Sequence, residues 1–150
     1  NLMALRFEEY AAKGRAFVEE VAVELNTTDQ DQAGRILRSV LRALRNRLTV
    51  EESFQFISQL PMAIKGVYVD GWQVKLNPSK LKHIEDFRSE VIHEDEHAAL
   101  KDFAKEGSVD EAIKSVFVVL GRHISPGEIE HVLNALPAAL RASLEGNEDN

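Results

Sequence analysis

Cysteine is absent from this chain of 150 residues. Its absence excludes disulfide bonds, cysteine-based zinc sites and thiol catalysis, and it fits a cytoplasmic location. No apolar run approaches the roughly 18 residues that a membrane-spanning helix needs, and the first residues lack the long apolar core of a signal peptide. Neither a nucleophile elbow nor a glycine-rich phosphate loop occurs. We therefore expect a cytoplasmic protein without a membrane partner.

What the chain does contain is enough apolar material to fold. Hydrophobic residues make up 44% of it, which is ordinary for a globular protein and too high for a disordered one. The length suits one compact domain or two closely packed halves. The net charge of −7 disfavours nonspecific binding of the whole molecule to nucleic acid or anionic lipid, although it does not bear on a local basic patch.

Two segments, residues 32–68 and 108–144, follow the same pattern of helix, turn, helix, Leu-Pro and helix. The prolines of the two Leu-Pro pairs are separated by 76 positions (137 − 61 = 76). At this shift apolar residues meet apolar residues, as in Val40 and Val116, Leu44 and Leu120, Ile57 and Leu133, and Ile64 and Leu140. Because apolar positions stay in register without a gap, the pattern predicts a duplicated helical unit.

We therefore predict an all-α fold of about eight helices, in which two four-helix units pack as a pseudo-two-fold bundle. The first unit spans residues 1–72, a connector spans 73–79 and the second unit spans 80–150, all within one compact domain. The first helix of the second unit is expected within residues 81–100. Two helix starts match a capping box, Thr49 with Glu52 and Ser108 with Glu111.

Residues 48–72 and 124–144 resemble a bacterial family known as domain of unknown function 2267. The features that carry the resemblance are Leu60-Pro61, Leu136-Pro137, the turn Ser125-Pro126-Gly127-Glu128, and Gly71-Trp72. The resemblance covers nearly the whole chain and implies a tandem all-helical repeat of bacterial origin. It implies no activity and no catalytic residue.

A possible metal motif lies at residues 93–97, where His93, Glu94 and His97 satisfy the pattern H-E-x-x-H. On a helix the two histidines would stand one turn apart and could bind zinc, with Glu94 as the general base of a hydrolase. However, charged residues fill both middle positions, and no third-ligand motif follows. The pattern favours a solvated acidic helix face over adventitious or regulatory metal binding, and metal binding over hydrolysis.

Four arginines, Arg35, Arg38, Arg42 and Arg45, recur at steps of three and four residues and share one helix face. We call them the arginine ladder. Guanidinium groups match carboxylates and phosphates, so the ladder could bind a protein partner or a nucleic acid. Internal pairing is the more ordinary interpretation, with acidic candidates Glu19, Glu20, Glu24, Glu51 and Glu52. The acidic net charge favours internal pairing, then a protein partner, then nucleic acid.

Tyr68 and Trp72 flank Gly71 at the end of the first unit. An exposed aromatic pair could anchor a partner, but aromatic residues at a turn are more often part of the core.

These features favour a non-enzymatic module that acts through protein–protein contacts or self-association. We expect no catalytic residues and no cofactor. The alternatives are a metal-dependent hydrolase that uses His93, Glu94 and His97, and a nucleic-acid-binding bundle that uses the arginine ladder.

Overall fold

The computed structural model describes residues 4–75 and 78–146. Within these ranges the chain forms nine α-helices, one short 3-10 helix and no β-strand, which confirms the predicted all-α bundle. The helices are α1 (Phe7–Leu25), α2 (Gln30–Arg45), α3 (Val50–Ile57), α4 (Met62–Val69), α5 (Ile84–Glu94), η1 (Glu96–Ala98), α6 (Ala99–Asp102), α7 (Ser108–His123), α8 (Pro126–Leu133) and α9 (Ala138–Gly146). No helix in the described ranges combines the length and apolar character needed to cross a membrane.

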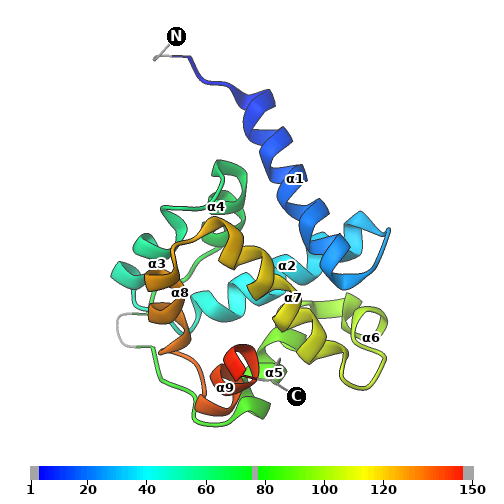
Figure 1. The fold of residues 1–150 in the computed structure, drawn as a ribbon, viewed down its shortest axis with the longest axis vertical. Helices are drawn as coiled ribbons and strands as arrows, with labels where there is room; N and C mark the ends of the chain where they lie inside the picture. Colours follow the sequence, from blue (N-terminus) through cyan, green and yellow to red (C-terminus); the bar gives the residue numbers. More distant parts are fainter. Residues whose placement is uncertain (1–3, 76–77, 147–150) are drawn as a thin grey trace.

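Helix α2 runs through the middle of the bundle and contacts α1, α4, α5 and α7 (Figure 1). Leu37, Leu41 and Leu44 recur at steps of four and three residues and are almost fully buried. Phe17 of α1 and Phe87 of α5 belong to the same core. Because α2 has neighbours on most sides, several of its polar side chains, including Arg35, Ser39 and Arg45, pair with groups on those neighbours.

The capping signals predict one helix start correctly and another incorrectly. Thr49 and Glu52 form the reciprocal capping box at the start of α3. At α7 the predicted box is wrong, because Gly107 takes the cap position with a φ of 81° and no side chain caps the helix. Ser108 instead donates its hydroxyl hydrogen to the carbonyl oxygen of Lys105. A left-handed glycine thus replaces the serine cap.

Helix bounds recur at the shift seen in the sequence. Helices α3 and α8 begin 76 positions apart (126 − 50 = 76), as do α4 and α9 (138 − 62 = 76). Paired positions are buried alike, including Phe56 with Val132. The pseudo-two-fold packing and the unit boundaries stay predictions. Parts of those units, residues 1–3 and 147–150, and residues 76–77 of the connector lie outside the described residues.

The first helix of the second half is shorter than the residues 81–100 that the sequence allowed. Helix α5 ends at Glu94, and Glu96 has a φ of 55°, which a right-handed helix does not accept. The chain continues through η1 and the short α6. This break adds a helix to the eight that were predicted.

Helix α1 projects beyond the rest of the bundle at its N-terminal end (Figure 1). Phe17, Val21 and Ala22 in its second half are buried. By contrast, Leu5 and Phe7 are 71% and 64% exposed. We call residues 4–10 the overhang.

Candidate functional site

Helices α1, α2 and α4 enclose a surface groove with a volume of about 860 Å³. Its apolar walls come from Ala11, Gly14, Val18, Ala63, Ile64 and Val67. Ile64 is buried, whereas Val18 and Val67 are half-buried. The groove therefore presents an apolar surface that residues 4–75 and 78–146 leave uncovered.

Small residues create the groove. A Cβ atom on Gly14 would lie 2.8 Å from the Cβ atom of Ala63, so the glycine allows α1 and α4 to cross closely. On the opposite wall, a Cβ atom on Gly34 would meet no other atom within 4 Å. Close contact at Gly14 thus forms the floor, and the missing side chain at Gly34 leaves the groove open.

Charged side chains of both signs surround these walls. Arg15, Arg35 and Arg38 line the groove together with Glu19 and Asp31. Among the described residues, neither Arg15 nor Arg38 makes an ion pair or a side-chain hydrogen bond. The Nε atom of Arg38 is buried without a hydrogen-bond partner in this part of the structure. Two arginines that line the groove therefore have no partner of opposite charge in the described part of the chain.

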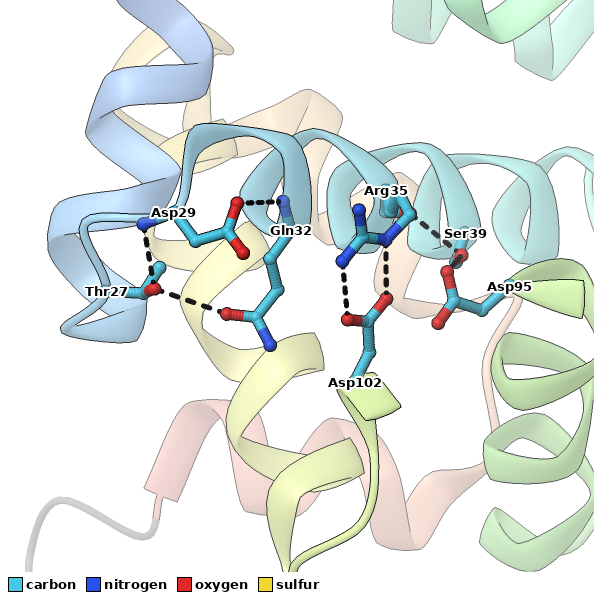
Figure 2. Close-up of polar contacts among 7 residues, drawn as sticks. All are labelled: Thr27, Asp29, Gln32, Arg35, Ser39, Asp95 and Asp102. Carbon is cyan, nitrogen blue, oxygen red and sulfur yellow. Dashed lines mark hydrogen bonds and ion pairs between the residues drawn. The ribbon is translucent and has the colours of Figure 1, made fainter. Parts of the chain in front are cut away.

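Arg35, in contrast, is neutralised inside the protein (Figure 2). Its Nε and Nη2 atoms donate to the two carboxylate oxygens of Asp102, each at 2.9 Å. The side chain of Asp102 is fully buried. This bidentate pair ties α6 to α2, because the two planar groups match in geometry.

A second carboxyl group, Asp95, lies beside this pair (Figure 2). Its Oδ1 atom is 3.3 Å from the hydroxyl oxygen of Ser39, and its Oδ2 atom is buried with no partner in the described residues. The hydroxyl of Ser39 also lies 2.8 Å from the carbonyl oxygen of Arg35. Because a serine hydroxyl has one hydrogen, donation to that carbonyl leaves its oxygen free to accept a hydrogen bond from a protonated Asp95.

The two carboxyl groups differ in pKa for physical reasons. Burial, followed by the neighbouring Asp102, raises the pKa of Asp95 to about 7. Burial is the largest single effect on Asp102 and acts to raise its pKa, but the hydrogen bonds and positive charge of Arg35, with further contributions from Asp95 and Gln32, together outweigh it and hold that pKa below its usual value. With Asp95 protonated, one guanidinium faces one carboxylate and the buried cluster carries no net charge.

A second hollow, of about 710 Å³, borders this cluster at Asp102. Thr27, Gln32 and Asp102 line it along with residues 104–108. Thr27 donates its hydroxyl to the side-chain oxygen of Gln32, and Asp29 caps α2 through the backbone N–H of Gln32 (Figure 2). Three of its polar side chains, those of Thr27, Gln32 and Asp102, are thus already bonded within the protein.

The remaining ladder arginines are also engaged within the protein. Arg45 is buried and donates to the carbonyl oxygens of Tyr68 and Asp70, at 2.9 and 2.8 Å. Arg42 lies 3.7 Å from the carboxylate of Asp70. Internal pairing therefore holds for three of the four, but the glutamates proposed as partners are wrong. Glu20 and Glu24 instead pair with Arg122.

The proposed metal ligands lie on either side of a helix break. His93 belongs to α5 and His97 to η1, so the two histidines do not stand on one continuous helix. Both are exposed. Glu94 accepts a hydrogen bond from Asn46 at 3.1 Å. Within the described residues, no group of three or more acidic or histidine side chains could hold a metal ion.

The two aromatic candidates have different environments. Tyr68 is fully buried and its hydroxyl lies 2.7 Å from that of Ser53. Trp72 is half-buried and meets Tyr68 edge to face, with ring centroids 5.9 Å apart. Phe54, 59% exposed, lies beside Trp72. Only the Trp72 side of this pair reaches the surface.

Sequence reasoning did not single out Arg15, Gly34, Asp95 or Asp102. Gly34 did carry a signal, because a glycine inside a helix pattern often has a packing reason. Asp95 and Asp102 carried no such signal, since the chain has 25 acidic residues. Asp95 was assigned to a solvated acidic face, and this was wrong: it is 2% exposed.

Comparison with known proteins gives a family and no activity. The family described as "Uncharacterized conserved protein (DUF2267)" matches residues 14–143. The match includes every residue of the groove except Ala11. No curated protein matches the chain.

Proposed function

The chain belongs to the uncharacterized DUF2267 family, and we propose that it is a non-enzymatic helical module that binds another protein chain in the groove between α1, α2 and α4. The observation that carries this proposal is the combination of apolar walls with two arginines, Arg15 and Arg38, that have no ion-pair partner among the described residues. An apolar segment with an acidic residue beside it would match both features.

Size also supports a peptide or helix as the ligand. The groove, at about 860 Å³, lies within the range of ligand sites, but it is open along the helices rather than closed over a small molecule. An amphipathic helix binds in such grooves through apolar residues spaced three and four positions apart.

The hydrolase alternative has less support. A hydrolase of this type needs His93 and His97 one turn apart on a helix and a third ligand. The break after Glu94 removes that spacing. The alternative would be revived if chelator-treated protein reloaded with zinc retained the metal, and if changing both histidines to alanine abolished that retention.

Nucleic-acid binding has less support as well. Arg35, Arg42 and Arg45 already have partners within the protein, and phosphate binding would have to break these contacts. The alternative predicts salt-sensitive retardation of DNA or RNA that charge reversal at Arg38 and Arg42 abolishes.

Photocrosslinking in the native cell tests the proposal. A photoreactive amino acid at Gly34 would reach into the groove, and the space there accepts a side chain. Gly121 is the matched control, because it is an exposed helical glycine on α7 with open space around it. We expect a discrete protein adduct from position 34 that is lost when Val67 is changed to Glu. An absence of adducts, or the same adducts from position 121, would contradict the proposal.

A further inference from the structure

The apolar face of α1 continues past the bundle into the overhang. Phe7, Ala11, Gly14 and Val18 follow one another at steps of four, three and four residues, so they form one stripe. Ala11, Gly14 and Val18 line the groove. Phe7 extends the stripe toward the N-terminus. Its ring meets that of Tyr10 edge to face, with 6.0 Å between ring centroids. The overhang and the groove are therefore two parts of the same helix face.

One acidic residue of the overhang, Glu8, has the charge opposite to that of two arginines that line the groove. Glu9 is engaged on its own helix by Arg6 and Lys13. Glu8 makes no ion pair among the described residues. The groove offers Arg15 and Arg38, which likewise have no ion-pair partner in the described part of the chain. An acidic residue beside an exposed aromatic ring thus matches the arginines and the apolar walls of the groove, which Glu19 and Asp31 also line.

We infer that the overhang binds in the groove of a second copy of this chain, so that two α1 helices pair antiparallel in a symmetric dimer. This inference rests on the proposed function and identifies the ligand of the groove. A register that brings Phe7 against Val18 of the second copy also brings Ala11 against Gly14. Glu8 then approaches Arg15 of the second copy from the same flank of the helix pair.

Two-fold symmetry makes this arrangement close on itself. Each contact occurs twice, because the overhang of each copy occupies the groove of the other. Ala11, which is small and half-buried, lies at the centre of this register and allows the two α1 helices to approach there. Both exposed Phe7 rings leave water in the same event, which favours the dimer through apolar burial.

Analytical ultracentrifugation of the full chain over a range of concentrations tests the inference. We expect a reversible dimer that Phe7→Ser and Gly34→Phe each convert to a monomer, the second by filling the groove. Leu100→Ser is the control for the first, because Leu100 is 89% exposed elsewhere on the molecule. Gly121→Phe is the control for the second. Circular dichroism confirms that each variant is folded.

A charge exchange makes the test specific to the register. Glu8→Arg and Arg15→Glu should each weaken the dimer at least about tenfold, because like charges then face each other. An equimolar mixture of the two variants should form a heterodimer, since position 8 of each variant then meets an opposite charge at position 15 of the other. A merely structural effect of either substitution would not be reversed by mixing.

Three results would overturn the inference: a monomer at all concentrations, a dimer that survives both Phe7→Ser and Gly34→Phe, or single charge variants that mixing does not rescue. If the wild type is a monomer while the probe at Gly34 still captures a different protein, self-association fails and the proposed function stands. If the wild type is a monomer and the probe at Gly34 captures no protein, the inference and the proposed function both fail.

Discussion

Asp95 is a carboxyl group buried at the end of α5, and its protonation is linked to folding. In the unfolded chain an aspartate has a pKa of about 3.9, whereas in the folded protein burial and the neighbouring Asp102 raise it to about 7. A raised pKa means that the folded state binds the proton more tightly. The stabilisation from Asp95 is therefore complete below about pH 4 and is lost as the pH rises through 7.

We predict that Asp95→Asn flattens this pH dependence, because an amide resembles the protonated carboxyl group. Between pH 5 and pH 8 the free energy of unfolding of the wild type should fall more steeply than that of the variant. At pH 8 the variant should be more stable by up to about 4 kcal/mol, since a rise of the pKa from about 3.9 to about 7 corresponds to this free energy at about 1.4 kcal/mol for each unit. Urea unfolding at several pH values measures this.

The matched control is Asp86→Asn, the same chemical change at an exposed position of the same helix. With Asp86→Asn, the free energy of unfolding should fall with pH as steeply as it does in the wild type. Equal slopes in the wild type and in Asp95→Asn would show that Asp95 is ionised in the folded protein throughout this range.

At the scale of helices, the crossing of α1 and α4 depends on Gly14. Alanine is normally favoured over glycine within a helix by about 1 kcal/mol. At this position, however, the new Cβ atom would lie 2.8 Å from that of Ala63, and two packed helices would have to move apart.

We therefore predict opposite effects of the same substitution at two glycines. Gly14→Ala should lower the free energy of unfolding by about 1–2 kcal/mol because of overpacking. Gly34→Ala should be neutral or should raise it by up to about 1 kcal/mol, since that position has open space. Chemical denaturation of the two variants side by side measures the difference. Equal stabilities would contradict the close crossing.

At the scale of the whole molecule, the two predicted units share their contacts. Helix α1 of the first half packs on α7 of the second, and α5 of the second half packs on α2 of the first. The halves also meet through α2 with α7 and through α3 with α8. Neither half buries its apolar residues without the other, so we expect a single cooperative unit.

We predict that unfolding is two-state across the whole chain. Trp72 is the only tryptophan, and it contacts Tyr68 and Phe54 in the first half, so its fluorescence reports on that half. Far-ultraviolet circular dichroism reports on all helices. The two urea transitions should coincide in midpoint and slope. A fluorescence transition separate from the helix transition would mean that the halves unfold independently.

The sequence by itself determined the helices, because the interactions that form them are local. Leu37, Leu41 and Leu44 show the core face of α2 through their spacing, and Thr49 with Glu52 cap α3 across three residues. Local rules predicted two features incorrectly. The left-handed backbone of Gly107 replaces the cap expected from Ser108, and that of Glu96 interrupts the helix expected through residues 93–97.

Only the tertiary structure decided which side chains meet. Arg35 and Asp102 are 67 positions apart, and Ser39 and Asp95 are 56 apart. Nothing local distinguishes these carboxylates from the other acidic residues, because their burial depends on how α5 and α6 pack against α2. The groove has the same origin, since Gly14 and Ala63 form its floor only once α1 crosses α4. Helix formation requires neighbours one turn away, whereas charge pairing and cavity shape require the folded chain.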